Sequence, residues 1–327
     1  MSTTPATPPA SSEPADGCTA SIVVPSYRGA ARLPQLLDSL ARQTPGTPPF
    51  EVIVVVDGID DGSVEIVERE DRLDARVILF PANRGRVAAL NAGFDAAQGE
   101  ILIRCDDDLL PGPDYVVAHI DAHENGSRGV VGLYLNQYEP TAFAEAYGRS
   151  ADTAFRRAAY QAPPDMTWRY WAGNCSVPRQ VWETVGAYDP DYRLYGWEDV
   201  DYGFRIAAAG FPVDLVRRLE TGHRVAAVTT EIRARRAAHS SAARRIFERK
   251  HGTDVLPSAV PSWSAWNLGV RAVSHLTTII APHRVGAAID KLLPHVPRSI
   301  GHKLVALAVE GSALSGYRHP NRATEVF

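Results

Sequence analysis

Short apolar runs alternate with amphipathic stretches over the part of the chain that follows the N-terminal residues. Residues 21–24 form an apolar run that ends at Pro25, and residues 52–56 form a β-branched run typical of strands buried on both faces. Between them, residues 32–43 place leucines at helical spacing, and a Thr-Pro-Gly sequence follows. The alternation continues with a helix predicted at 63–69, a strand at 76–80, a helix at 86–97 and a strand at 100–104.

This order of elements predicts an α/β fold with an open, mostly parallel central sheet flanked by helices. Polar clusters follow the predicted strands at residues 25–28, 57–61, 83–86 and 106–108. The carboxyl ends of parallel strands meet at one edge of a sheet, where the ligands of such folds bind. We therefore expect the four clusters to converge on one site.

The second half of the chain mixes predicted strands and helices before it becomes helical. Strands are expected at 130–135, 168–171 and 213–216, and helices at 142–160 and 198–209. A basic helix is expected at 231–250, and amphipathic helices follow at 266–280, 284–293 and 300–314. The chain is thus divided into a disordered, Pro- and Ser-rich arm (1–18), an α/β domain (19–230) and a helical C-terminal region (231–327).

The composition is that of a globular protein. Hydrophobic residues make up 45% and charged residues 22% of the 327 positions, and the net charge of −4 offers no basic excess for nucleic-acid binding. The three cysteines have neither the number nor the spacing for a disulfide framework or a zinc site. The N-terminus lacks the apolar core of a signal peptide, and no run of about eighteen apolar residues occurs, so a cytoplasmic protein without a membrane span is expected.

The triplet Asp106–Asp108 is the strongest chemical signal in the chain. Three adjacent carboxylates repel one another unless a positive charge lies among them. Oxygen ligands suit Mg²⁺ or Mn²⁺, and such a cation with a bound diphosphate would neutralise the triplet. A solvated acidic loop is the simpler alternative, but the position at a predicted strand end favours a functional site.

Two other strand ends carry candidate ligands. Asp57 would either accept hydrogen bonds from a base or ribose or form an ordinary Asp-Gly turn. Arg84 and Arg86 stand at the start of a predicted helix, where the helix N-terminus and the guanidinium groups favour phosphate. The alternative there is plain capping of the helix by Asn83.

The helix start at residues 197–202 and the isolated His223 complete the candidates. The segment packs three acids beside aromatic rings, which suits a general base next to a sugar ring. Acidic capping of the helix is the alternative. His223 would add a metal ligand, although a lone histidine is more often structural.

The ordered set of segments from residue 21 to about residue 225 resembles family 2 glycosyltransferases with the GT-A fold. The segments are SIVVPSYRG, VVVDGIDDGS, NRGRVAALNAGFDAAQGE and IRCDDDLLP, in that family's order. The later stretch GNCSVPRQVWETVGAYDPDYRLYGWEDVDYGFRIAAAG is similar to the galactosyltransferase-like C-terminal half of such domains. The resemblance implies inverting transfer of a sugar from a nucleotide-diphosphate sugar to an acceptor hydroxyl.

The resemblance also implies roles for individual residues. Asp199 matches the catalytic base, with Asp201 and Glu198 as alternatives, and His223 is similar to the metal-ligand histidine of galactofuranosyl-type members. The metal, Mn²⁺ or Mg²⁺, would be held by Asp106, Asp108 and His223. The implied donor-binding residues are Pro25, Tyr27, Arg28, Asp57, Arg84, Asp106 and Asp107, and the implied acceptor-binding residues are Trp197 and Glu198.

The expected partners are small molecules and glycans rather than nucleic acid. The donor is a nucleotide sugar, with UDP favoured over GDP and dTDP, and the acceptor is a glycan, a lipid-linked glycan or a small molecule. The basic helix at 231–250 is either a solvated face or a contact with an anionic acceptor, a diphosphate or the inner face of the membrane. The later helices would pack on the domain, form a homodimer or cradle the acceptor.

Two competing functions stay open at this point. A sugar-nucleotide nucleotidyltransferase also uses an α/β nucleotide fold and Mg²⁺, but residues 25–29 contain a single glycine where such enzymes have a glycine-rich loop. A non-catalytic nucleotide-sugar-binding protein would be free to lose its base, and Asp199 is present.

Overall fold

Two β-sheets organise the protein in the computed structural model, which describes residues 18–193 and 196–323. The predicted arm lies outside these residues, apart from Cys18. The large sheet has seven strands, which are β1 (Ala20–Ser26), β2 (Phe50–Val56), β3 (Asp74–Leu79), β4 (Ile101–Cys105), β6 (Gly129–Val131), β8 (Asn174–Pro178) and β9 (Val213–Leu215). The small sheet has three, which are β5 (Leu109–Leu110), β7 (Tyr134–Gln137) and β10 (Thr221–Arg224).

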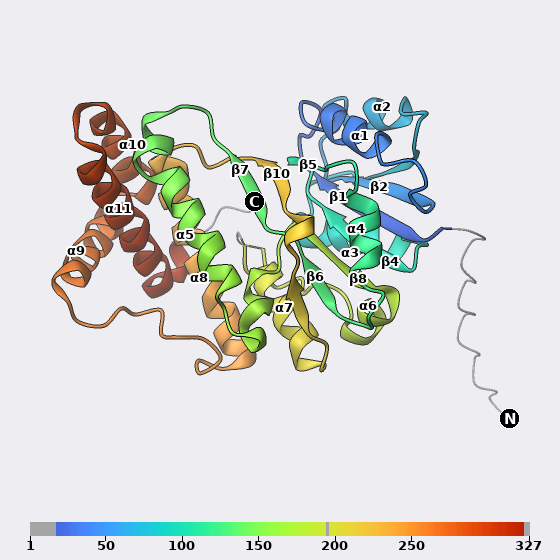
Figure 1. Ribbon diagram of the computed structural model, residues 1–327. Helices are drawn as coiled ribbons and strands as arrows, with labels where there is room; N and C mark the ends of the chain where they lie inside the picture. The colour runs from blue at the N-terminus through green and yellow to red at the C-terminus, as the bar shows by residue number, and fades with distance from the viewer. Residues whose placement is uncertain (1–17, 194–195, 324–327) are drawn as a thin grey trace, which may run out of the picture.

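The large sheet is mostly parallel, as the sequence predicts. Its strands lie in the order β3-β2-β1-β4-β8-β6-β9 (Figure 1). Strands β1 to β4 pair in parallel, and β8 runs antiparallel to its neighbours β4 and β6. The carboxyl ends of β1, β2 and β4 therefore meet at one edge of the sheet.

Helices cover both faces of the large sheet. Val52, Val54 and Val56 pack on one side with α1 (Leu33–Ala41), α2 (Ser63–Glu68) and α4 (Tyr115–Asp121). Ile53 and Val55 pack on the other side with α3 (Arg86–Ala96), α6 (Arg179–Val185) and α7 (Trp197–Ala208). Successive side chains of a strand point to opposite faces, so a strand covered on both faces is apolar at every position.

The C-terminal helices form a layer that contacts the rest of the protein through the first and the last of its long helices. Helix α8 (Thr230–His251) packs along α10 (Pro282–Leu292) and α11 (Arg298–Arg318), and α9 (Ala265–Ile279) packs on α11. In Figure 1 these helices gather at the end of the molecule opposite α1 and α2. The fully buried Phe247 of α8 stacks against Trp168 and contacts Trp197 and Phe204. Helix α8 is thus part of the main hydrophobic core.

Two of the predicted strands differ from the structure. The strand predicted at 168–171 is wrong, because residues Pro164–Tyr170 form a 3₁₀-helix in which the indole of Trp168 donates to the carbonyl of Asp165. The strand predicted at 130–135 is two strands in different sheets, β6 and β7. The chain crosses between them at Gly132, where a Cβ atom would lie 2.1 Å from the carbonyl oxygen of Leu219.

The prediction for residues 142–160 is a single helix, and the structure adds an irregularity to it. A π-helix (Ala144–Gly148) leads directly into α5 (Arg149–Tyr160). Strand β8 and helices α4 and α6 were not anticipated from the pattern. Within residues 18–193 and 196–323, no helix has the length and apolar character needed to cross a membrane.

Candidate active site

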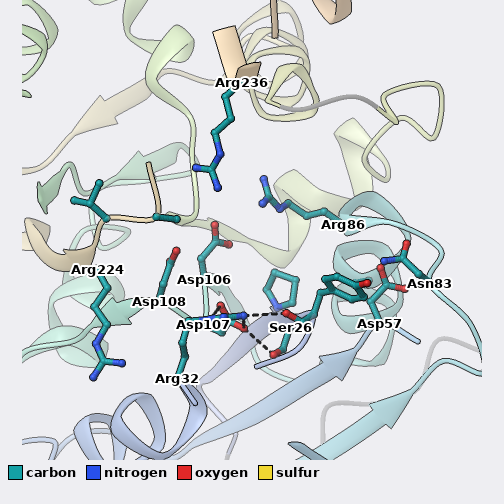
Figure 2. Close-up of a pocket in the computed structure, with 15 residues that line it drawn as sticks. Ser26, Arg32, Asp57, Asn83, Arg86, Asp106, Asp107, Asp108, Arg224 and Arg236 are labelled. Carbon is teal, nitrogen blue, oxygen red and sulfur yellow. Dashed lines mark hydrogen bonds and ion pairs between the residues drawn. The ribbon is translucent and has the colours of Figure 1, made fainter. Parts of the chain in front are cut away.

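A pocket of about 530 Å³ opens at the carboxyl edge of the large sheet, as the strand-end clusters predict (Figure 2). All four clusters contribute to its wall, and the chain from β10 into α8 closes it. Of the residues predicted to bind donor or metal, those that line it are Pro25, Tyr27, Asp57, Asp106, Asp107 and Asp108. It is also lined by Ser26, Arg32, Asn83, Arg86, Ala89, Arg224, Val225, Ala226 and Arg236.

The carboxylate of Asp107 accepts hydrogen bonds from two other residues of the pocket wall. Arg32 donates to both of its carboxylate oxygens, from Nε and Nη2, each at 2.8 Å, and Ser26 Oγ donates at 2.7 Å. These contacts fasten the end of β1 and the residue before α1 to the triplet. Burial raises the pKa of Asp107, while the hydrogen bond from Arg32 opposes that change.

Arg104 connects the aspartate triplet to the predicted base. Its side chain is fully buried, and it donates from Nε to Asp106 at 2.8 Å and from Nη1 to Asp199. Burial disfavours the guanidinium charge, but the two carboxylates outweigh burial and hold the pKa of Arg104 well above its usual value. One buried cation therefore fixes the position of Asp106 relative to Asp199.

Asp199 has the electrostatics of a general base. Its side chain lies in the first turn of α7 and is almost completely buried. Burial is the main reason that its pKa is raised to about 7. The nearby negative charge of Glu198 also raises this pKa, whereas the positive charges of Arg104 and Arg86 lower it. A carboxylate with a pKa near neutrality can accept a proton from a substrate and release it again at physiological pH.

Asp108 and His223 meet where β5 pairs with β10. His223 Nε2 lies 3.3 Å from Asp108 Oδ2, and the imidazole stacks on the ring of Tyr134 with centroids 4.5 Å apart. On the opposite side of the ring, Nδ1 lies 2.6 Å from Asn136 Oδ1. The amide nitrogen of Asn136 donates to Asp152, so its oxygen must face the histidine.

This arrangement fits a cation between Asp108 and His223. Because Asn136 Oδ1 can only accept, Nδ1 carries the proton, and a neutral ring then turns the Nε2 lone pair toward a carboxylate. Either a proton or a metal ion between His223 Nε2 and Asp108 Oδ2 would give both atoms a partner. Among the described residues, no three His, Cys, Asp or Glu side chains form a complete metal site. Mg²⁺-type ions commonly take one or two carboxylates and complete their shell with substrate phosphates and water.

Asp57 and Arg86 shape the other side of the pocket. The carboxylate of Asp57 accepts hydrogen bonds from the backbone N–H groups of Arg84 at 2.6 Å and Gly85 at 2.8 Å, which fixes the turn before α3. Arg84 itself lies over the ring of Phe80 and lines a neighbouring pocket. Arg86 lines both pockets and pairs with Glu198 at 3.2 Å.

The remaining predicted residues occupy different settings. Tyr27 is 42% exposed, and the guanidinium of the exposed Arg28 lies over its ring, 5.4 Å from the centroid. Glu198 is buried and accepts a hydrogen bond from the backbone N–H of Gly196. The indole of Trp197 donates to Ser240 and packs on Phe247, which places this ring at the contact between α7 and α8.

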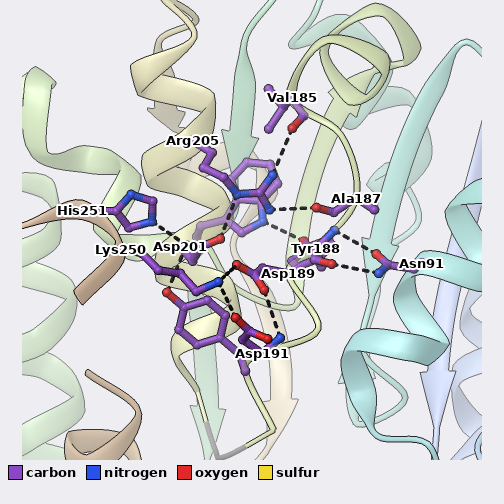
Figure 3. A network of polar contacts seen from close by, with 12 residues as sticks. Asn91, Val185, Ala187, Tyr188, Asp189, Asp191, Asp201, Arg205, Lys250 and His251 are labelled. Atoms are coloured by element: carbon purple, nitrogen blue, oxygen red, sulfur yellow. Dashed lines mark hydrogen bonds and ion pairs between the residues drawn. The ribbon is translucent and has the colours of Figure 1, made fainter. Parts of the chain in front are cut away.

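Asp201, the alternative base, belongs to a structural network (Figure 3). It is fully buried and accepts hydrogen bonds from Tyr192 Oη at 3.0 Å and Arg205 Nε at 2.8 Å. His251 Nε2 of α8 lies 2.6 Å from the same carboxylate. These contacts tie α7 to the loop before it and to the end of α8, so Asp199 is the acid better placed for chemistry.

The sequence interpretation missed Arg32, Arg104 and Arg224, whereas it placed Arg236 in the basic helix that was expected near the site. Arg32, Arg224 and Arg236 line the pocket, and Arg104 lies beneath it. Arg104 had a readable signal, because a charged residue inside the apolar strand Ile101–Cys105 must find buried partners. Arg224 comes from a distant part of the chain, and no local pattern distinguishes it from a surface arginine.

Comparison with protein families identifies the α/β part of the chain. Residues 21–180 match the family described as "Glycosyl transferase family 2". The match ends before α7, so the resemblance of the later residues to a galactosyltransferase-like half stays a prediction.

Curated relatives extend the similarity beyond the family match. The chain is 30% identical over 287 residues to validoxylamine A glucosyltransferase of Streptomyces hygroscopicus subsp. jinggangensis, an alignment that covers 76% of this chain and 64% of that protein. It is 28% identical over 253 residues to the uncharacterized glycosyltransferase YfnE of Bacillus subtilis, covering 62% of this chain and 64% of that protein. The chain thus spans less than two thirds of the length of these relatives.

Solved structures share the fold over nearly the whole chain. The mannosyltransferase PcManGT from Pyrobaculum calidifontis, in complex with GDP-Man and Mn²⁺, aligns with a TM-score of 0.61 at 19% identity, covering 93% of this chain and 88% of that chain. Residues 1–349 of S. aureus TarS, in complex with UDP, align with a TM-score of 0.50 at 15% identity, covering 94% and 92%. At these identities the likeness shows the fold, which is GT-A.

Proposed function

Because residues 21–180 of this chain match glycosyl transferase family 2, we propose that the chain is a metal-dependent inverting glycosyltransferase. It moves a sugar from a nucleotide-diphosphate sugar to an acceptor hydroxyl. The observation that carries the proposal is the contact of one buried cation, Arg104, with both Asp106 and Asp199. This contact holds a donor-side carboxylate and a candidate base in one fixed arrangement.

The chemistry of the proposed step follows from these positions. Asp199 accepts the proton of the acceptor hydroxyl as the oxygen attacks the anomeric carbon of the donor sugar. The bond from that carbon to the diphosphate breaks on the opposite face, and the electron pair leaves with the nucleoside diphosphate. A single base on the acceptor side is sufficient for inversion, and the raised pKa of Asp199 suits that role.

The proposed cofactor is Mn²⁺ or Mg²⁺, held by Asp108 and His223 with Asp106 beside them. Such an ion supplies positive charge that stabilises the leaving diphosphate. The donor set supports it, since Asp108 and His223 lie 3.3 Å apart with their acceptor atoms facing. A structure of the same fold, the mannosyltransferase, is in complex with Mn²⁺.

The donor is proposed to lie across the pocket from Tyr27 to Asp108. The exposed side chain of Tyr27 lines the pocket as a proposed partner for the base, and Arg86, Arg224 and Arg236 line the wall that would face the phosphates. UDP is favoured on the family resemblance, and the TarS structure is in complex with UDP. The mannosyltransferase of the same fold is in complex with GDP-Man, so the fold leaves the base open.

The remaining proposals concern the region beyond residue 230. We take residues 19–230 as the catalytic domain and residues 231–327 as a helical region that serves it. Leu268, Ile279 and Leu292 on α9 and α10 are 54%, 74% and 50% exposed. Apolar side chains of this size on neighbouring helices support a peripheral contact with the inner face of the membrane or with a second copy of the chain.

Calorimetric titration tests the proposed function directly. UDP, GDP and dTDP are titrated separately, each with and without Mn²⁺. Tight, metal-dependent binding of one nucleotide is the expected result and identifies the donor class. Absence of binding by all three to folded protein would reject the proposal, and donor binding without any transfer would favour a non-catalytic nucleotide-sugar-binding protein.

A further inference from the structure

A second pocket, beside the donor pocket, has the properties of a carbohydrate site. We propose that this pocket is a subsite for a sugar or cyclitol ring of the acceptor. Neither Asp199 nor the predicted acceptor-binding residues Trp197 and Glu198 line it, so the ring held here is not the group that gives its proton to Asp199. The assignment of the ring to an acceptor rests on the proposed glycosyl transfer.

The pocket has a volume of about 330 Å³ and adjoins the donor pocket. Val225, Ala226 and Arg236 line both of them. Its other walls come from β7, the π-helix with α5, and the first turns of α8. A molecule bound here would therefore lie next to the aspartate triplet, and its volume suits one ring or a small glycoside.

Five of the fifteen residues that line the pocket are phenylalanine or tyrosine. The lining includes Tyr134, Tyr138, Phe143, Tyr147 and Phe155. Phe155 is 55% exposed, an unusual position for phenylalanine on a helix surface, and meets the edge of Tyr170 with ring centroids 5.5 Å apart. Flat apolar faces of this kind pack against the C–H faces of sugar rings, and an exposed ring becomes useful when a ligand covers it.

One of these rings links the pocket to the reaction centre. The hydroxyl oxygen of Tyr134 accepts a hydrogen bond from the backbone N–H of Gly173 at 2.7 Å. Gly173 packs directly on the carboxylate of Asp106, since a Cβ atom there would lie 2.1 Å from Asp106 Oδ2. Only Gly173 therefore separates the hydroxyl of Tyr134 from the carboxylate of Asp106.

Polar groups at the floor of the pocket supply directional contacts. Asp152 and Asn136 line it and bond to each other, and Arg156 Nε lies 3.4 Å from Asp152. Arg233 and Arg236 of α8 lie on the opposite wall. Hydrogen-bond donors and acceptors around aromatic faces match a ring that carries several hydroxyl groups, because each hydroxyl both donates and accepts a hydrogen bond.

An irregular helical turn forms part of the pocket wall. Residues Ala144–Gly148 form a π-helix, a departure that often occurs at functional sites. The turn ends at Gly148, which packs on the ring of Tyr138, where a Cβ atom would lie 2.7 Å from Cε1. Gly148 and Ala151 are both small, so the helix lines the pocket without filling it.

The pocket on the other side of the donor site is the less suitable one. It is lined by Arg84, Arg86, Arg193 and Glu198, and its aromatic residue Tyr192 is buried with its hydroxyl bonded to Asp201. That pocket offers charges without an open aromatic face. The aromatic pocket is therefore the better site for a neutral ring.

Saturation-transfer NMR with methyl β-D-glucopyranoside and myo-inositol as probes tests the proposal. At least one probe is expected to show saturation transfer to its ring protons with the full chain. Phe155→Ala is expected to weaken the binding of that probe about threefold to tenfold, which is the effect of losing one aromatic contact. The second variant, Ala151→Phe, fills the pocket and is expected to abolish the signal. Trp263→Ala, which removes another exposed aromatic ring, is the matched control and is expected to leave it unchanged.

Two results would overturn the proposal. One is the absence of any probe signal, and the other is a signal that persists unchanged in both Phe155→Ala and Ala151→Phe. Nucleotide binding with Mn²⁺ is measured by calorimetry on the same samples and is expected to be unaffected by either variant. A chain that binds a probe but no nucleotide would reject the proposed transfer, so the two failures are distinguishable.

Discussion

The guanidinium of Arg104 donates a hydrogen bond to Asp199, although the two residues are 95 positions apart in the chain. Arg104 ends an otherwise apolar part of β4, and Asp199 begins α7. The same guanidinium also binds Asp106, so the relative position of the triplet and the base depends on one side chain. Buried polar networks of this kind are rigid when every member has a partner.

Replacing Arg104 by methionine is therefore expected to destabilise the protein. The substitution leaves the buried carboxylate of Asp199 and the partly exposed carboxylate of Asp106 without their cation, and breaking a buried pair typically costs about 3–5 kcal/mol. The free energy of unfolding, measured in urea, gives the change. Arg128→Met is the matched control, because its partly exposed pair with Asp214 is worth at most about 1 kcal/mol. Equal effects of the two substitutions would contradict the bridging role.

Asp199→Asn is expected to remove transfer while leaving donor binding nearly intact. A positioned base contributes about 10²–10⁴ in rate, so kcat falls by that factor. Steady-state kinetics and nucleotide calorimetry separate the two effects. Asp201→Asn serves for comparison and should lower the unfolding midpoint while transfer persists, since Asp201 holds Tyr192, Arg205 and His251. Wild-type rates in the Asp199 variant would exclude it as the base.

The rate of transfer is expected to depend on the ionisation of Asp199. Its pKa is raised to about 7, and only the carboxylate can accept the proton. The logarithm of kcat/KM should therefore rise with pH below about 7 and level off above it. Glu198→Gln removes a nearby negative charge, lowers the pKa of Asp199 and should shift the profile to lower pH. A profile that stays flat down to pH 5, with donor binding intact, would rule out this assignment.

Removal of the divalent cation is expected to stop transfer. Chelation with EDTA should abolish activity, and Mn²⁺ should restore it. Asp108→Ala and His223→Ala are each expected to weaken Mn²⁺ binding in the presence of UDP by about tenfold or more, measured by electron paramagnetic resonance. His275→Ala, a change on the exposed face of α9, is the control. Unchanged Mn²⁺ affinity in both pocket variants would place the metal elsewhere.

The strand-end clusters were predictable because buried parallel strands have a strong sequence signature. The apolar runs before Pro25, Asp57 and Asp106 locate three strand ends, and parallel pairing then brings those ends together. No further information is needed to expect a pocket there. The same reasoning does not assign roles within the pocket, and the structure shows Asp107 bonded to Arg32 and Asp57 bonded to the turn before α3.

Other parts of the site depend on pairings that leave no local pattern. Strand β8 carries the buried polar residues Asn174 and Ser176, which form hydrogen bonds with His119. These polar residues interrupt the apolar pattern by which a buried strand is recognised in a sequence. Strands β5, β7 and β10 have two to four residues each, too few for a periodic signal. The contact of Asp108 with His223 exists only because β5 pairs with β10.

The small sheet also has a consequence for the order in which the protein assembles during synthesis. Its strands lie near residues 110, 135 and 222, whereas β1 to β4 and their helices follow one another directly. Pairings between distant segments form more slowly than local ones, and N-terminal segments leave the ribosome first. We expect the nucleotide-facing half to fold while the rest of the chain is still being made. The Asp108–His223 pair forms only after β10 has been made, so we expect the metal site to be completed later than the sheet edge beside it.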